Sequence, residues 1–297
     1  MKSSNRKLLQ RYALLIGAVI ITVALYYLFD DHIDLLLDES TDGKVICTFI
    51  DVGQGDSTLI TYQDCAILID AGDEDAWPAI RKVFRAHKIQ KIDLLVATHP
   101  HADHIGSMDD VLKNIPVDKI AMSCATPDTL AFERLLDAID ASDVSTIFPS
   151  SGDVLTYDGI MLQILHPNSD AAYDNLNNYS LVIRLVTPYG TALFTGDAET
   201  SAENEILTTG HDVNVDVLKV GHHGSSTSTS ASFLEASAPQ YSVIHVGIDN
   251  DYGHPSNKVL DRLQKNNIVI YRTDTHGTIT MFMSETGIRF YVEREAA

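Results

Sequence analysis

The stretch that decides the fold reads Thr98-His99-Pro100-His101-Ala102-Asp103-His104. It follows an apolar run at residues 92–98 and precedes a predicted helix that begins near Ile105. Three imidazoles and a carboxylate so close together are costly to bury without a shared partner, and both groups are ligands of Zn²⁺ and similar divalent metals. His99 and His101 are expected to point toward one metal, and Asp103 and His104 toward a second. The alternative is a solvated polar loop.

Two later strand ends carry the same residue types and argue against a solvated loop. Residues 193–197 are a short apolar run that ends in Gly196-Asp197, and residues 218–225 contain the pair His222-His223. A single Gly-Asp pair is a weak signal, since most such pairs are turns. Three ligand-rich strand ends in one chain are a strong signal, and Asp197 is expected to offer one oxygen to each metal.

The rest of the chain beyond Lys44 predicts one domain over residues 44–297, without a long linker or a repeat. Apolar runs predict strands at 45–51, 57–62, 66–70, 92–98, 161–165, 181–186, 192–195, 215–220, 241–246 and 268–271, and a hairpin through Gly287. Helical spacing predicts helices at 77–87, 129–141, 230–236 and 256–265. Strands closed by helices in both halves predict layered α/β sheets with helices on their outer faces.

The order of the motifs His-Pro-His-Ala-Asp-His, Phe-Thr-Gly-Asp-Ala-Glu and Lys-Val-Gly-His-His-Gly-Ser resembles the metallo-β-lactamase superfamily. That resemblance implies an α/β fold, an αββα sandwich with two metals at one sheet edge. Four further segments are similar to the hydrolase domain of ComEC-type DNA-uptake proteins and their stand-alone relatives: residues 51–57, 68–72, 177–182 and 252–256. The resemblance extends from about Val45 to about Tyr291.

The resemblance also implies a role for each candidate site residue. His99 and His101 would bind the first metal, and Asp103 and His104 the second. Asp197 would bridge the two, and His222 would complete the second site, with His223 ranked after it. Asp70 would support the metal-binding histidines from behind, although it also fits a simple turn aspartate.

One departure from the superfamily pattern concerns the first metal. Many members supply a third histidine where this chain has Asn178-Tyr179-Ser180. The ComEC-like branch also lacks this histidine. Ser180 is therefore an additional candidate, and water or substrate is expected to complete a labile first site. His166 is the nearest upstream histidine, but its His-Pro-Asn turn needs no metal. His254 is a candidate contact to the substrate or leaving group, against a structural turn histidine.

The metals implied are two divalent ions, zinc first and manganese second. They would activate water, Asp103 would orient it, and a phosphodiester suits the arrangement because its transition state is anionic. The expected substrate is DNA or a phosphate-bearing envelope polymer. One alternative is a phosphocholine-type esterase acting on cell-wall teichoic acid, which would need an aromatic cage from residues such as Tyr173, Tyr179 and Tyr252. The other is a non-catalytic metal-binding scaffold or partner in DNA uptake.

The N-terminal segment predicts attachment to a membrane. Residues 12–29 are apolar apart from Gly17 and Thr22, long enough to cross a bilayer once, and four basic residues precede them. The positive-inside rule then places residues 1–11 in the cytoplasm and the hydrolase outside, beyond an acidic stalk at residues 30–43. A cleavable signal peptide and a buried core helix are the alternatives.

Composition excludes two classes of protein and disfavours a third. The net charge is −20, from 21 basic and 41 acidic residues, so the chain is a poor candidate for nucleic-acid binding by a coat of lysine and arginine. Any nucleic-acid chemistry would need a local cationic centre such as metal ions, and any role in DNA transport would need a membrane partner. Three cysteines exclude a disulfide scaffold and a cysteine-rich zinc module but leave one bridge open.

Overall fold

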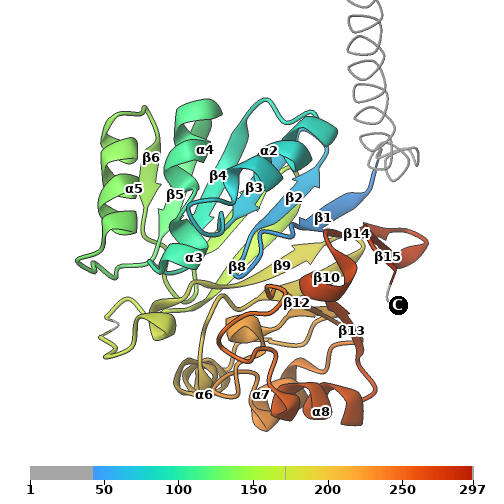
Figure 1. Cartoon of the computed structure of the whole chain (residues 1–297). Coiled ribbons are helices and arrows are strands. Elements are labelled where there is room, and N and C mark those ends of the chain that lie inside the picture. The colour runs from blue at the N-terminus through green and yellow to red at the C-terminus, as the bar shows by residue number, and fades with distance from the viewer. Residues whose placement is uncertain (1–42, 171, 296–297) are drawn as a thin grey trace, which may run out of the picture. The chain divides into compact units, whose positions relative to one another are not determined.

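The structure is a computed structural model that describes residues 43–170 and 172–295 (Figure 1). Its first sheet has eight strands in the order β15-β14-β1-β2-β3-β4-β5-β6. The strands β3 to β6 are parallel to one another, and the others pair antiparallel. The bounds are β1 Val45–Phe49, β2 Thr58–Tyr62, β3 Cys65–Ile69, β4 Ile92–Ala97, β5 Val117–Met122, β6 Ser145–Ile147, β14 Ile279–Ser284 and β15 Gly287–Val292.

The second sheet has seven strands in the order β13-β12-β11-β10-β9-β8-β7. The strands β10 to β13 are parallel, and β7 to β10 form an antiparallel meander. The bounds are β7 Val154–Tyr157, β8 Ile160–His166, β9 Val182–Thr187, β10 Gly190–Phe194, β11 Val217–Lys219, β12 Tyr241–Ile244 and β13 Val269–Arg272.

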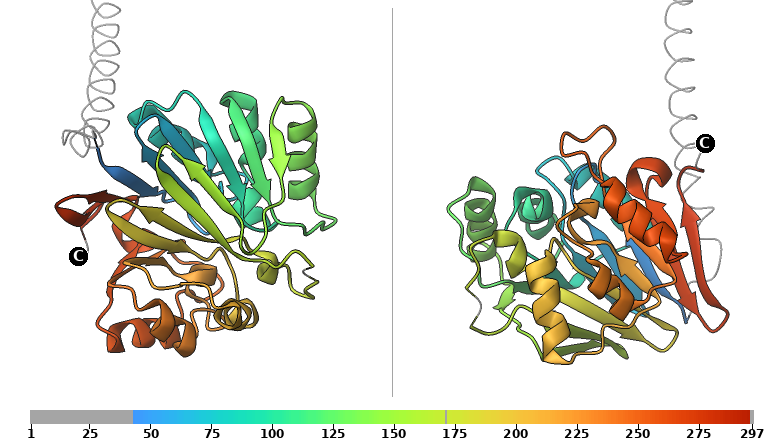
Figure 2. Two further views of the ribbon diagram at one scale, coloured as in Figure 1. Left: turned by 180° about the vertical axis from the view of Figure 1, so that it is seen from behind. Right: turned by 90° about the horizontal axis from the view of Figure 1, so that it is seen from below.

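Three apolar clusters define four layers (Figure 2). One lies between the sheets, and alternate residues of β1 enter it: Val45, Cys47 and Phe49. The second lies under helices α2 Trp77–Ala86, α4 Met108–Asn114 and α5 Leu130–Asp140, and the third under α6 Thr200–Thr209, α7 Ala231–Ser237 and α8 Asn257–Lys265. The predicted α/β fold with two sheets and outer helices is confirmed.

Strand β4 shows why both faces of each sheet must be apolar. Leu94 and Val96 enter the cluster between the sheets, whereas Ile92, Leu95 and Ala97 enter the cluster under the helices. A strand that is covered on both faces reads as a continuous apolar run rather than an alternating one. The polar residues that follow Ala97 therefore mark the point at which the strand leaves the core.

The carboxyl ends of the parallel strands bring the candidate residues together. Strands β3 and β4 end side by side in the first sheet, and β10, β11 and β12 end side by side in the second. A backbone hydrogen bond of 2.9 Å from the Leu181 N–H to the Thr98 carbonyl joins the two edges. In α/β folds this edge is where ligands bind.

Two predictions concern other parts of the chain. The anchor predicted for residues 12–29 and nearly all of the stalk predicted for residues 30–43 lie outside the described residues. Within residues 43–170 and 172–295, no helix has the length and apolar character that a bilayer crossing needs. The three cysteines are free, with Cys47 and Cys65 buried and Cys124 exposed, so the bridge that the sequence left open is not formed.

His87 gives the fold a pH dependence that is separate from the candidate site. Burial lowers the pKa of this imidazole to about 4, and its Nε2 lies 3.1 Å from the Thr48 hydroxyl. The unfolded chain takes up this proton near pH 6.5, so protonation favours unfolding as the pH falls from 6.5 to 4. We expect His87→Ala to flatten the fall of the urea midpoint over this interval; an unchanged slope would contradict the assignment.

Candidate metal centre

The first sheet supplies four of the candidate ligands from one short segment. His99 follows β4 and is fully buried, and His101 has extended backbone angles at the N-cap of helix α3, Ala102–Ile105. The predicted helix start near Ile105 is therefore three residues late, and Asp103 and His104 lie within α3. The Nε2 atom of His99 lies 3.0 Å from the Nδ1 atom of His101.

The second sheet supplies Asp197 and His223. Asp197 follows β10, and its backbone N–H donates a 3.0 Å hydrogen bond to the Ser180 hydroxyl. His222 and His223 form a tight turn after β11, and both have left-handed backbone angles, with φ of 49° and 51°. Non-glycine residues adopt this conformation at a cost, and the turn aims His223 into the cluster while His222 stays near its edge.

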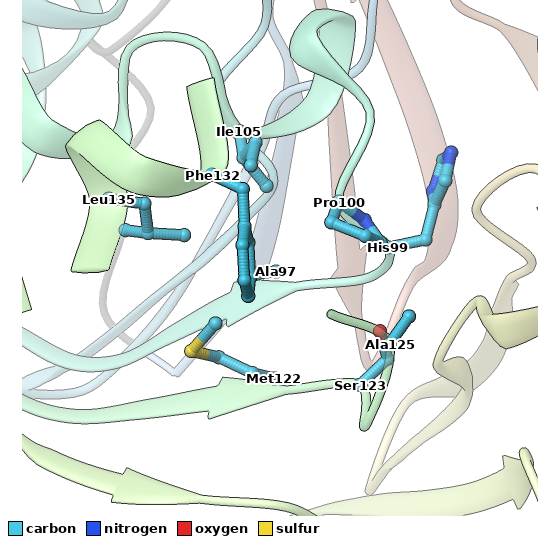
Figure 3. A pocket seen from close by; sticks show the side chains of 9 residues that line it. All are labelled: Ala97, His99, Pro100, Ile105, Met122, Ser123, Ala125, Phe132 and Leu135. Atoms are coloured by element: carbon cyan, nitrogen blue, oxygen red, sulfur yellow. The ribbon is translucent and has the colours of Figure 1, made fainter. Parts of the chain in front are cut away.

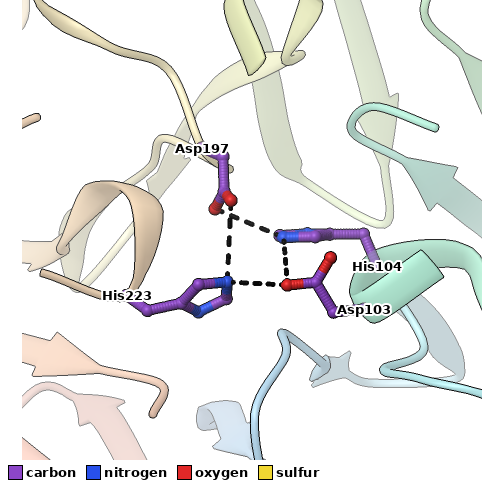
Figure 4. Close-up of side chains that lie close together, drawn as sticks. All are labelled: Asp103, His104, Asp197 and His223. Atoms are coloured by element: carbon purple, nitrogen blue, oxygen red, sulfur yellow. Dashed lines mark hydrogen bonds and ion pairs between the residues drawn. The ribbon is translucent and has the colours of Figure 1, made fainter. Parts of the chain in front are cut away.

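Four side chains from the two sheets meet at one point (Figure 4). The Oδ1 atom of Asp197 lies 3.2 Å from His104 Nε2, and Asp197 Oδ2 lies 3.6 Å from His223 Nε2. Asp103 Oδ2 closes the group at 3.1 Å from His223 Nε2 and 4.0 Å from His104 Nε2. One ligand atom from each residue lies within 4.8 Å of all the others. This group is the second-metal cluster.

His99 and His101, the candidate ligands of the first metal, lie beside the second-metal cluster. His99 Nε2 is 3.9 Å from Asp197 Oδ2, so the aspartate faces both groups, as predicted for a bridging ligand. Ser180, the additional candidate, contacts the loop of Asp197, because its hydroxyl accepts the N–H of that residue. His166 is also engaged elsewhere, since its ring nitrogens contact the Ser180 carbonyl and the Tyr173 hydroxyl.

The donor atoms fit a divalent metal. His104 Nε2 and Asp197 Oδ1 are buried without a hydrogen-bond partner in the described chain, although a buried polar atom normally has one. The other ring nitrogen of His104, Nδ1, lies 2.8 Å from Asp70 Oδ2. A carboxylate that holds one nitrogen of a histidine and leaves the other toward a shared point is typical of metal sites. Asp70 takes the supporting position that the sequence predicted.

The electrostatics of the cluster favour a cation. Burial lowers the pKa of His104, but the carboxylates of Asp197, Asp70, Asp103 and Asp56 outweigh it and hold the pKa well above its usual value. Burial likewise lowers the pKa of His223, but Asp197 and Asp103 raise it to about 10. The same carboxylates would attract a divalent ion, which binds the neutral imidazole and so displaces its proton.

Solvent reaches the centre from the side of Asp103. The side chains of Asp103 and His222 are 30% and 22% exposed, whereas those of His99, His104 and His223 are at most 2% exposed. His254 also lies on this side, with its ring centroid 5.5 Å from that of His222, and Tyr252 stacks on it at 5.8 Å. The Nδ1 atom of His254 is buried without a partner among the described residues, which suits a ligand contact.

A pocket behind His99 is too small for a substrate (Figure 3). Its volume is about 10 Å³, near the lower limit for one water molecule. The ring of Phe132 and the side chains of Met122, Ile105 and Leu135 help to line it, so it is a gap in the packing under α5. A substrate therefore has to approach from the exposed side of Asp103.

The structure places His223, rather than His222, in the second-metal cluster. His222 Nε2 lies 3.7 Å from Asp197, but its Nδ1 faces Glu199 at 3.4 Å, and His222 is outside the second-metal cluster. We expect His223→Ala to lower the zinc bound per chain from about two ions to about one, and His222→Ala to leave it unchanged. Metal analysis after dialysis measures both; equal losses would restore His222 as a ligand.

Four residues near the centre were not identified as site residues from the sequence. Asp56, Lys219 and His245 lie directly behind the second-metal cluster, and Glu199 faces His222. His245 contributes through its backbone, because its carbonyl oxygen lies 3.1 Å from His223 Nδ1. Two signals were available: His245 follows an apolar strand as the candidate ligands do, and Lys219 is a charge inside an apolar strand.

Comparisons with known proteins agree with this geometry. Residues 50–247 match the family model described as the metallo-beta-lactamase superfamily. "ComE operon protein 3" of Bacillus subtilis is 33% identical over 259 residues, 81% of this chain and 33% of the relative. "Competence protein ComA" of Neisseria gonorrhoeae is 28% identical over 250 residues, 84% of this chain and 34% of the relative. The chain thus spans about a third of the length of these relatives.

Solved structures show the same fold at low identity. The metallo-beta-lactamase fold protein YhfI from Bacillus subtilis is 13% identical, with a TM-score of 0.52 over 77% of this chain and 96% of that one. Tm1679, titled a metal-dependent hydrolase of the beta-lactamase superfamily, is 12% identical, with a TM-score of 0.52 over 77% of this chain and 95% of that one.

Proposed function

The chain belongs to the metallo-beta-lactamase superfamily and is related to competence proteins, and from this we propose that it is a hydrolase that uses two divalent metal ions to cleave phosphodiester bonds. The observation that carries the proposal is the meeting of Asp103 and His104 from one sheet with Asp197 and His223 from the other. Buried carboxylates and imidazoles without enough hydrogen-bond partners are what a divalent ion would satisfy.

The ligand set divides between two sites. His99, His101 and Asp197 would hold the first ion, and Asp103, His104, Asp197 and His223 the second. Zinc suits this mixture of imidazole and carboxylate best, and manganese is the second choice. When bound, the two ions would activate water as a nucleophile and offset the charge that develops on an attacked phosphorus centre.

The side chains on the open edge would handle the water and the substrate. Asp103 Oδ2 faces His223, so the other oxygen of this exposed carboxylate is available to accept a hydrogen bond from the attacking water. Burial and the nearby His222 lower the pKa of His254, which keeps its ring neutral near pH 7. A neutral imidazole at this edge can contact a phosphate oxygen or the leaving group.

The names of the matched relatives favour a polymer such as DNA as the substrate. The matched relatives carry names that refer to competence, and a phosphodiester occurs in every nucleotide link of DNA. The net charge of −20 gives the chain no general affinity for phosphates, so binding would depend on the metal centre. An envelope polymer with phosphodiester links has the same chemistry and remains an outcome of the test.

The alternative of a phosphocholine-type esterase has weaker support. A quaternary ammonium group prefers several aromatic faces around one space. Tyr173 packs edge-on against Tyr179, and its hydroxyl donates a 2.6 Å hydrogen bond to Glu205, whereas Tyr252 stacks on His254. These tyrosines thus belong to two different ring contacts. The second alternative, a scaffold without turnover, would retain metal binding and lack hydrolysis.

We also propose that residues 12–29 anchor the chain in the cell membrane by a single crossing. The apolar run and the preceding basic residues support a cytoplasmic N-terminus and a hydrolase domain outside the membrane. A role in DNA uptake would then require a membrane partner. Protease added to intact cells is expected to remove the hydrolase domain; full protection of the domain would overturn this topology.

The test of function uses the full chain in detergent, freed of metal and then supplied with Zn²⁺ or Mn²⁺. We expect metal-dependent hydrolysis of bis(p-nitrophenyl) phosphate and of single-stranded DNA, and slower hydrolysis of p-nitrophenyl phosphorylcholine. Faster hydrolysis of the phosphorylcholine ester would favour the esterase, and cleavage of the aryl diester without DNA would favour another polymer. Metal binding with no turnover of any of the three would favour the scaffold.

A further inference from the structure

A buried ion pair lies directly behind the second-metal cluster. Lys219, the last residue of β11, is 3% exposed, and Asp56, in the loop between β1 and β2, is 4% exposed. The Lys219 ammonium group is in direct contact with Asp56 Oδ2. Removing two charges from water costs several kcal/mol for each ion, so a pair in this position contributes little to stability unless other contacts offset that cost.

The other contacts of the pair lead to the candidate ligands. The Lys219 ammonium donates a 3.1 Å hydrogen bond to the carbonyl of Gly196, the residue before Asp197. The backbone N–H of Asp56 donates a 3.1 Å hydrogen bond to the carbonyl of Asp103. Its side-chain Oδ1 lies 3.3 Å from His223 Nδ1. Asp103 and His223 are candidate ligands themselves, and Gly196 is bonded to the candidate ligand Asp197.

Glycine at position 55 makes one of these contacts possible. A β-carbon on Gly55 would lie 2.4 Å from the Asp103 carbonyl oxygen, and the φ of 143° is one that other residues rarely adopt. The loop can therefore bring the Asp56 N–H against α3 only because this position lacks a side chain. The close approach is therefore built into the loop.

The pair also bears on the orientation of His223. The Nδ1 atom of this ring faces the His245 carbonyl at 3.1 Å, which can only accept a hydrogen bond and so holds the proton on Nδ1, and Asp56 Oδ1 lies 3.3 Å from the same nitrogen. The Nε2 atom faces Asp103 and Asp197, so it is the ring nitrogen that would bind the second ion in place of its proton.

We propose that Asp56 and Lys219 are positioning residues that set Asp103, Asp197 and His223 in place for the second metal ion, without touching that ion. The inference rests on the proposed dinuclear site and deepens it. Lys219 supplies the positive charge that a buried Asp56 requires and restrains the loop of Asp197. Asp56 restrains α3 and fixes the ring of His223. The pair thereby joins the metal-binding loops of the two sheets from behind.

The experiment titrates the metal-free full chain in detergent with Co²⁺, followed by calorimetry and by the visible spectrum, which reports the ligand geometry. We expect Asp56→Asn and Lys219→Met each to weaken the second Co²⁺ by about 10–100-fold, the usual effect of removing a group that supports a metal ligand. The first Co²⁺ is expected to weaken by less than the second, since the pair supports only Asp197 among the three candidate ligands of the first site. Lys91→Met, which breaks the exposed pair with Asp118, is the matched control.

The double variant Asp56→Asn/Lys219→Met separates positioning from stability. It leaves no unpaired buried charge, so its melting temperature is expected to recover toward that of the wild type, while the second Co²⁺ stays weak. Recovery of both the melting temperature and the affinity would overturn the proposal, as would wild-type affinity in the single variants. Absence of a second Co²⁺ in the wild-type chain would overturn the dinuclear site itself, and because no turnover is measured this result is distinct from a failure of hydrolysis.

Discussion

Replacing Asp197 with alanine is expected to lower kcat/KM for bis(p-nitrophenyl) phosphate by at least about 10³-fold, the upper end of the loss from removing one electrostatic group from an active site. The reason is its position between the two candidate ion sites. Its Oδ1 atom faces His104, and its Oδ2 atom faces both His99 and His223. No other carboxylate in the described chain contacts these three histidines together.

The measurement combines steady-state kinetics with the metal content of the dialysed chain. Asp197→Ala should lose most of both ions, because each site loses a ligand. Asp212→Ala is the matched control, since this carboxylate is 65% exposed and pairs with Arg184 away from the centre. If Asp197→Ala kept two ions and normal turnover, the chemistry would have to lie elsewhere on the molecule.

Asp103→Ala is expected to reduce hydrolysis by about 10²–10³-fold while the circular dichroism spectrum stays that of a folded chain. Asp103 is the most exposed member of the second-metal cluster, so its removal leaves little void in the core. The variant loses both a metal ligand and the oxygen that faces incoming water. Asp103→Asn keeps the shape and is expected to be nearly as inactive, because an amide is a poor ligand and cannot take up a proton.

Two further variants serve as controls for Asp103→Ala, one expected to be inactive and one expected to be active. His101→Ala should also abolish hydrolysis, through loss of the first ion, and His87→Ala should leave hydrolysis unchanged, because the His87 ring contacts the Thr48 hydroxyl and not a candidate ligand. Most of the wild-type activity remaining in Asp103→Ala would show that another group orients the attacking water.

The sequence predicted the core strands because they are buried on both faces and therefore read as apolar runs. It missed elements whose pattern is weaker. Strand β5 has the exposed residues Asp118 and Lys119 at its second and third positions, and β6 has three residues. Helix α6 has few apolar positions, and one of its buried residues is Glu203, which accepts backbone hydrogen bonds from the loop before α7. Such contacts between distant segments leave no periodic trace in the sequence.

The residues of the candidate site also divide into those that the sequence indicated and those that it did not. The ligands of the first sheet lie within six residues, so their spacing alone indicated a shared metal. The choice between His222 and His223 depends on two consecutive residues with left-handed backbone angles. Glycine is the residue whose presence indicates that conformation, and neither position is a glycine. Lys219 and Asp56 are 163 positions apart in the chain, and their contact exists only after both sheets have folded.

The origin of the ligands in two different sheets has a thermodynamic consequence. An ion held at once by α3 and by the loops after β10 and β11 acts as a cross-link between the halves of the sandwich, and it is lost when they separate. At an ion concentration a hundredfold above Kd, occupancy would add about 2.7 kcal/mol, which is roughly 5–10 °C in Tm for a domain of this size. The Tm would then depend on the concentration of the metal ion, and the chain without its ions would be the form most readily unfolded and degraded.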